Sequence, residues 1–102
     1  MNEEMQNLME MVEAATDELV GLLQALVRVP TVNTGSPDSG NEIEACRILE
    51  ERFREEGIPS VILESAPTRG NLLARVGSDT GPRLMLMSHL DVVPAEPSKW
   101  TH

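Results

Sequence analysis

Leu84-Met85-Leu86-Met87-Ser88-His89-Leu90-Asp91-Val92-Val93-Pro94 is the stretch that decides the fold. Its apolar first part is too short for a buried helix and runs into polar and turn-forming residues, a pattern that predicts a buried β-strand. In open α/β sheets, ligands bind where the carboxyl ends of the strands open onto a crevice. The polar residues at the end of this strand, His89 and Asp91, are therefore the candidate functional residues.

His89 and Asp91 are two positions apart, and residues with that spacing lie on the same face of an extended chain. An imidazole is a common metal ligand, and a metal-bound imidazole usually donates its other ring N–H to a carboxylate. The pair therefore predicts a metal ligand, His89, that is oriented by Asp91. The alternative interpretation is that two polar residues cluster by chance at the end of a strand.

The same stretch resembles the first metal-binding signature of the zinc-dependent amidohydrolases. That superfamily includes acetylornithine deacetylase, succinyl-diaminopimelate desuccinylase, aminoacylase and related carboxypeptidases and dipeptidases. Three further segments carry the resemblance over about residues 16–102. Residues 26–33 resemble the end of the family's first helix, residues 40–42 the start of its second helix, and residues 69–75 its second strand.

The resemblance implies that His89 binds one of two zinc ions, for which cobalt or manganese are possible substitutes, and that Asp91 is catalytic. The other ligands of the family and its general base correspond to positions beyond His102. We therefore expect residues 1–102 to be the N-terminal fragment of a metallohydrolase catalytic domain, inactive by itself. The parent protein is expected to hydrolyse the amide bond of an N-acyl amino acid or short peptide, and a homodimer of that parent is left open.

A zinc site formed by this chain alone would need more ligands than His89. Catalytic zinc takes three protein ligands and keeps one position open. The other imidazole is His102, and Cys46 falls on the inner side of an expected helix, as a packing thiol. A site made of His89, Asp91 and His102 is disfavoured, because Asp91 would have to serve both as a ligand and as the orienting group.

The first helix is expected from apolar residues that recur every three or four positions from Met5 to Leu26, and this face is predicted to turn toward a core. Pro30 ends that pattern. Thr16 is a candidate for a break, which would make residues 1–15 a helical extension. The same spacing also fits a short coiled coil. A non-catalytic helical module for self-association or partner binding is therefore the alternative function.

The second helix is expected to begin at Ser39, which has the spacing of a capping box with Glu42, and to end at Gly57. Strands are expected at residues 61–63 and 72–76. With the strand that bears His89, these elements predict an α/β fold. Its parts are two N-terminal helices and three strands of a mixed sheet, the opening part of a zinc-peptidase catalytic domain.

The composition excludes some classes of partner. Seventeen acidic and eight basic residues give a formal net charge of −9, which argues against binding to nucleic acid because a phosphate backbone needs a basic surface. A lone cysteine excludes an internal disulfide and fits a reducing compartment. The acidic N-terminus has no apolar leader, so we expect a cytoplasmic protein that does not contact a membrane.

Overall fold

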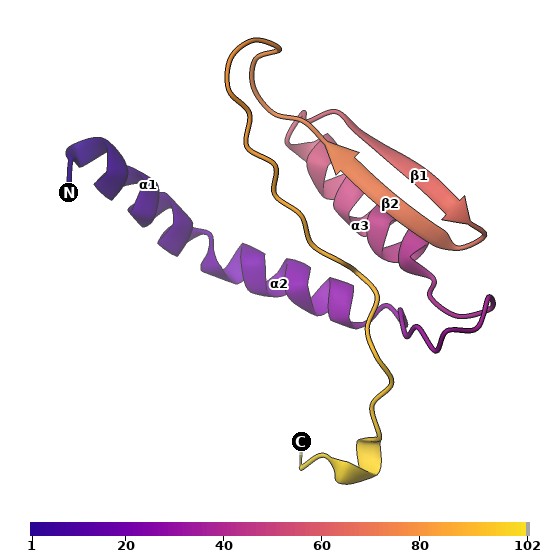
Figure 1. Cartoon of the computed structure of the whole chain (residues 1–102). Coiled ribbons are helices and arrows are strands. Elements are labelled where there is room, and N and C mark those ends of the chain that lie inside the picture. The colour runs from indigo at the N-terminus through magenta and orange to yellow at the C-terminus, as the bar shows by residue number, and fades with distance from the viewer. Residues whose placement is uncertain (102) are drawn as a thin grey trace.

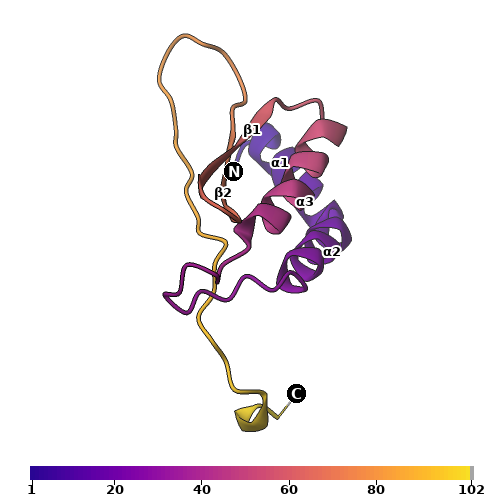
Figure 2. The same ribbon diagram turned by 90° about the vertical axis from the view of Figure 1, so that its right-hand side faces the viewer.

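The structure is a computed structural model and describes residues 1–101. The elements in this range are α1 (Glu3–Ala14), α2 (Thr16–Val27), α3 (Glu42–Glu55), β1 (Ser60–Ala66), β2 (Arg69–Ala74) and a short 3-10 helix, η1 (Pro97–Lys99). Figure 1 shows α1 and α2 running end to end beside a unit made of α3 and the β1–β2 hairpin. In the turned view of Figure 2, α3 lies between the hairpin and α2.

The core lies between α3 and one face of the hairpin. Ile43, Ala45 and Cys46 of α3 are buried, and Cys46 is completely enclosed. Burial raises the pKa of the Cys46 thiol, and the nearby carboxylate of Glu42 raises it further. The prediction that Cys46 is a packing thiol is therefore confirmed.

The N-terminus of α3 differs from the prediction. The helix begins at Glu42, while Ser39 lies in the preceding loop, where its hydroxyl accepts a hydrogen bond from the N–H of Thr34. The first-turn N–H groups of a helix have no partner within the helix. One of them, that of Ile43, donates to the carbonyl of Thr68 at 3.1 Å. The predicted capping box is therefore wrong, because the hairpin turn supplies the cap.

The C-terminus of α3 is as predicted. Gly57 has a φ of +69°, the left-handed conformation that a glycine adopts at lowest cost. Its N–H donates to the carbonyl of Arg54 at 3.0 Å, and the N–H of Ile58 donates to that of Phe53 at 2.9 Å. This pair of hydrogen bonds is the Schellman motif, which ends a helix and turns the chain back over its last turn.

The predicted break in the N-terminal helix is confirmed, since α1 and α2 separate at Ala15. The predicted core face is wrong for α1, whose apolar side chains at Met5, Leu8 and Val12 are all exposed. Figure 1 gives the reason: α1 extends past the unit formed by α3 and the hairpin, so these side chains have nothing to pack against.

The third predicted strand is not formed among the described residues. Leu84 and Leu86 are 84% and 86% exposed, and the sheet consists of β1 and β2 alone, paired antiparallel. The predicted three-stranded mixed sheet is therefore wrong for residues 1–101. An extended segment becomes a strand only along an edge within hydrogen-bonding distance. Here the loop after β2 leads the chain away (Figure 2), and the segment first makes a bridge at Val92, parallel to Val32.

The molecule exposes more surface than a closed domain of its size. Its accessible area is 8678 Å², whereas a folded monomer of 11.2 kDa exposes about 5,700 Å². Its radius of gyration is 16.9 Å, against about 13 Å for a compact chain of this length. Much apolar surface therefore has no cover within the described residues. No helix in this range has the length and apolar character needed to cross a membrane.

We predict that Gly70→Ala destabilises the unit formed by α3 and the hairpin. A Cβ at this position would lie 3.0 Å from Cα of Ile43 and 3.2 Å from Sγ of Cys46. Because a backbone atom cannot move aside cheaply, the free energy of unfolding should fall by about 1–3 kcal/mol in urea melts followed by circular dichroism. Gly21→Ala is the matched control, since a Cβ there enters open space on α2 and should stabilise the helix. Equal effects of the two substitutions would contradict the close packing.

Candidate functional site

Two extended segments, one before α3 and one after β2, lie side by side and hold the candidate site. The N–H of Val92 donates to the carbonyl of Thr31 at 3.0 Å, and the N–H of Asn33 donates to the carbonyl of Val92 at 2.8 Å. The buried hydroxyl of Thr31 donates to the carbonyl of Leu90 at 2.9 Å. The backbone on both sides of Asp91 is therefore fixed by the segment that precedes α3.

The structure brings the side chains of His89 and Asp91 together, as their spacing predicts. Nδ1 of His89 lies 2.8 Å from the backbone carbonyl oxygen of Asp91 and 3.2 Å from its Oδ1. Both of these oxygens are acceptors, so the contacts are hydrogen bonds when Nδ1 carries the proton. In the neutral ring, Nε2 then has a free lone pair. The side chain of His89 is 83% exposed, which leaves this nitrogen accessible.

The second oxygen of the Asp91 carboxylate has its own partners. Oδ2 accepts a hydrogen bond from Nδ2 of Asn33 at 2.9 Å, and it lies 3.7 Å from Nη2 of Arg69. Nε of Arg69 in turn donates to Oε2 of Glu42 at 2.7 Å. The hydrogen bond from Asn33 lowers the pKa of the Asp91 carboxyl most, partial burial raises it, and His89 lowers it again. The carboxylate is thus stabilised in its charged form.

Gly40 leaves room for this network. A Cβ at Gly40 would lie 2.6 Å from both Cδ and Nε of Arg69 and 2.8 Å from Oε2 of Glu42. The residue has a φ of +114°, which side chains rarely permit, and its N–H donates to the carbonyl of Val32 at 3.0 Å. Glycine is therefore needed here both for its backbone conformation and for the space it leaves.

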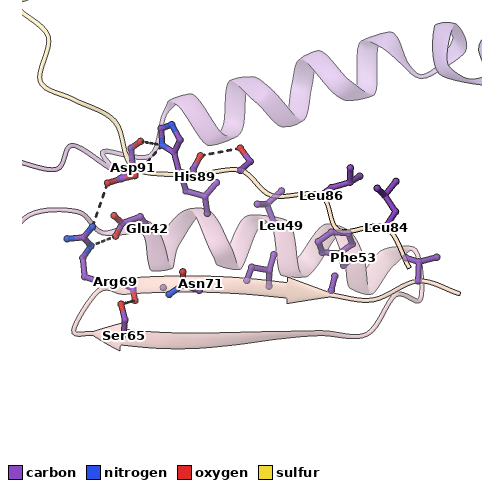
Figure 3. A pocket seen from close by; sticks show the side chains of 16 residues that line it. Glu42, Leu49, Phe53, Ser65, Arg69, Asn71, Leu84, Leu86, His89 and Asp91 are labelled. Atoms are coloured by element: carbon purple, nitrogen blue, oxygen red, sulfur yellow. Dashed lines mark hydrogen bonds and ion pairs between the residues drawn. The ribbon is translucent and has the colours of Figure 1, made fainter. Parts of the chain in front are cut away.

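The site lies at one end of a cavity of about 700 Å³ between α3, β2 and residues 84–91. Figure 3 shows two chemically different ends. The polar end carries Glu42, Arg69, His89 and Asp91, and the apolar end carries Leu49, Phe53, Leu84 and Leu86. Charged groups and hydrocarbon thus face the same space, as in a pocket that orients a ligand with one polar end.

The described residues do not bring together the ligands of a complete metal site. Within residues 1–101, no three side chains of His, Cys, Asp or Glu lie close enough to hold one metal ion. His89 fits the role of one ligand with an accessible nitrogen, whereas Cys46 is enclosed in the core and Asp91 is occupied by its neighbours. His102, considered from the sequence as a third ligand, lies outside the described residues. This donor set is too small for a zinc ion, which takes at least three protein ligands.

Comparison with curated proteins finds relatives along most of the chain. A probable succinyl-diaminopimelate desuccinylase of Staphylococcus aureus (strain MRSA252) is 36% identical over 86 residues, 83% of this chain and 19% of the relative. The succinyl-diaminopimelate desuccinylase of Methylobacterium sp. (strain 4-46) is 37% identical over 90 residues, 85% of this chain and 22% of the relative. The chain is a distant homologue of the succinyl-diaminopimelate desuccinylases.

The resemblance of this desuccinylase homologue to the amidohydrolases is thereby confirmed, and its extent is clear. A third relative, the probable desuccinylase of Staphylococcus epidermidis (strain ATCC 35984), is 34% identical over 83 residues, 80% of this chain and 19% of the relative. The chain spans about a fifth of the length of the curated relatives it matches. No family model matches it, and no solved structure matches it significantly.

The sequence of this homologue does not indicate three polar residues as parts of the site: Asn33, Glu42 and Arg69. The sequence predicts that Asn33 is a loop residue and that Glu42 is half of a capping box. Nothing in the sequence pairs them with Asp91, which follows Asn33 by 58 positions. One usable signal is Gly40, because a glycine in a loop can mark a position that needs a positive φ or a close approach of another chain segment.

We predict that the Asp91 carboxyl titrates below pH 3.8, its ordinary value. Because the pKa is lowered in the folded chain, the native state binds fewer protons than the unfolded state. The contribution of Asp91 to stability is therefore present above pH 3.8 and is lost as the pH falls through the lowered pKa. Carbon-13 NMR of the side-chain carboxyl measures the midpoint.

Asn33→Ala should move that midpoint up, since it removes the largest cause of the shift. Asn71→Ala is the matched control, because Asn71 bonds to the carbonyl of Leu63 on the exposed hairpin and not to Asp91. A midpoint at or above 3.8 in the unmodified chain would show that the Asn33 contact is not formed.

Proposed function

We propose that the chain is part of the catalytic domain of a zinc-dependent hydrolase of amide bonds, with His89 as a zinc ligand and Asp91 as the catalytic carboxylate that orients it. The observation that carries this proposal is the contact of Nδ1 of His89 with Asp91, which leaves Nε2 accessible. A carboxylate in that position fixes the tautomer of a ligating imidazole and makes it a stronger ligand. Cobalt and manganese are possible substitutes for zinc.

The substrate class follows from the relatives and from the resemblance. The relatives are desuccinylases of succinyl-diaminopimelate by name, so we propose an N-acyl amino acid, in the first place an N-succinyl amino acid, as substrate. A short peptide is the alternative within the same chemistry. When bound, zinc in such enzymes polarises the carbonyl and lowers the pKa of a bound water to about 7. The proposed parent works in the cytoplasm, and homodimerisation of the parent stays a prediction.

We further propose that residues 1–102 form the N-terminal part of this domain, with residues 1–15 as a helical extension. The uncovered apolar segment at residues 84–87 and the large accessible area support a missing cover. The relatives support this proposal as well, because the matched part is 19% of the Staphylococcus aureus protein. Since the described residues hold one candidate ligand, we expect no measurable hydrolase activity from the 102-residue chain alone.

A chimera tests the proposed function. The matched 90 residues of the Methylobacterium enzyme are replaced by the corresponding residues of this chain, extended through residue 102. The chimera should bind zinc and release succinate from an N-succinyl amino acid. Asp91→Ala should then lower zinc affinity or rate by roughly 10- to 100-fold. His89→Ala should lower both by more, because it removes the ligand itself.

His102→Ala is the matched control in the chimera, since it removes the other imidazole of the chain, to which the resemblance assigns no ligand role. Zinc content is measured by atomic absorption beside the rate of succinate release. An active chimera in which His89→Ala leaves both zinc content and rate unchanged would refute the assignment of His89.

Self-association is a second candidate function, favoured by one observation: α1 has no buried residue. Met5, Leu8 and Val12 lie on the expected apolar face and are all exposed. In the coiled-coil interpretation, this face binds the same face of a second copy. The break at Ala15 interrupts that face, which shortens the stretch that such a dimer could use.

Light scattering after size-exclusion chromatography tests self-association of the whole chain. The second candidate predicts a mass of twice 11.2 kDa, which Leu8→Glu should return to 11.2 kDa by placing a charge in the apolar interface. Gln6→Glu, which adds the same charge at a position outside the predicted apolar pattern, is the control. A mass of 11.2 kDa for the unmodified chain at high concentration eliminates this candidate.

A further inference from the structure

We propose that Asn33 and Arg69 are positioning residues that hold the Asp91 carboxylate, so that His89 keeps its proton on Nδ1 and presents Nε2 outward. The benefit for metal binding rests on the proposed function. The positioning of Asp91 is independent of the proposed function, because it follows from contacts within this chain.

The two oxygens of the Asp91 carboxylate have separate tasks. Oδ1 faces Nδ1 of His89, while Oδ2 accepts from Asn33 and faces Arg69. A carboxylate turns easily about its last bond when it has a partner on one side only. With Oδ2 held, Oδ1 stays directed at the imidazole. The backbone carbonyl of Asp91, 2.8 Å from Nδ1, is a second acceptor for the ring. The part of the ring orientation that comes from Oδ1 therefore depends on residues that do not touch His89.

The amide of Asn33 is itself held in one orientation. Its Oδ1 accepts a hydrogen bond from the N–H of Gly35 at 2.9 Å, which leaves Nδ2 directed at Asp91 at 2.9 Å. A flipped amide would place an acceptor against the carboxylate and a donor against the N–H, and both contacts would be lost. The backbone of Asn33 is fixed as well by its bond to Val92. Asn33 thus presents a donor and no acceptor to Asp91.

Arg69 is held from the other side. Its Nε donates to Glu42, which is 5% exposed and therefore binds its counter-charge in a largely dry environment. Nη2 of the same guanidinium lies 3.7 Å from Asp91, with space supplied by the missing side chain of Gly40. The planar guanidinium serves two carboxylates at once, which the point charge of a lysine does less well. Arg69 therefore joins Asp91 to the buried start of α3.

The tautomer of His89 is the direct readout of this network. In the metal-free, nitrogen-15-labelled 102-residue chain with a neutral imidazole, two-bond proton–nitrogen correlations distinguish a proton on Nδ1 from one on Nε2. We expect the unmodified chain to carry it mainly on Nδ1. Asn33→Asp keeps the shape and the bond to Gly35 but replaces the donor with a like charge. It should lower the ratio of the Nδ1 to the Nε2 form by roughly threefold to tenfold.

Two further variants complete the test. Arg69→Lys keeps the charge beside Glu42 but not the shared geometry, and should shift the ratio in the same direction by less. Ser39→Ala is the matched control: Ser39 lies in the same loop and bonds to Thr34 and Ser36, so its loss should leave the ratio unchanged. Backbone amide signals of α3 and the hairpin show that each variant is folded, and Asn33→Ala is measured beside Asn33→Asp in case the added charge opens the loop.

The results separate this inference from the proposed function. A proton mainly on Nε2 in the unmodified chain, or a ratio unchanged by both Asn33→Asp and Asn33→Ala, overturns the role of Asn33. A ratio unchanged by Arg69→Lys overturns the role of Arg69. Neither measurement involves zinc or catalysis, so failure of the hydrolase proposal in the chimera would leave this result standing, and the reverse also holds.

Discussion

Arg69 lies between the buried carboxylate of Glu42 and the carboxylate of Asp91, and so joins three parts of the molecule at one side chain. A buried carboxylate without a counter-charge is costly, so the start of α3 depends on this guanidinium. Arg69 also begins β2, directly after the turn whose Thr68 carbonyl caps α3. The start of the core helix, the hairpin turn and the orientation of the candidate site are therefore not independent features.

The elements formed by local interactions could be predicted from the sequence. Gly57 ends α3 because the left-handed conformation needs a glycine, and the break near Thr16 follows from local composition. Both hairpin strands were expected. β1 is longer than predicted, and β2 begins three residues earlier and ends two residues earlier than predicted, so residues 75 and 76 are not part of it. The contact of His89 with Asp91 was also predictable, since it depends on two positions of an extended chain.

The features that depend on distant partners could not be predicted in the same way. The apolar run at residues 84–87 indicates burial, but its sequence does not specify which strand edge or which face of another element covers it. Within the described residues, these side chains are exposed. Ser39 and Glu42 have the spacing of a capping box. In the structure, the carboxylate of Glu42 instead forms an ion pair with Arg69, 27 positions away, and the carbonyl of Thr68 caps the helix. Periodicity carries no information about such pairings.

The parallel bridge between Val32 and Val92 has a consequence for the order in which the chain folds. The hydrogen bonds from Thr31 to Leu90 and from Asn33 to Asp91 span 59 and 58 positions. In the hairpin, by contrast, the innermost strand pair, Ala66 and Arg69, is separated by a short turn. Closing a long loop costs more chain entropy, by about 0.6 kcal/mol for each doubling of its length. The hairpin and α3 thus assemble early, and the contacts of residues 31–33 with residues 90–92 form last and separate first. A ligand that requires the closed loop binds with an apparent affinity reduced by the fraction of molecules in which the loop is open.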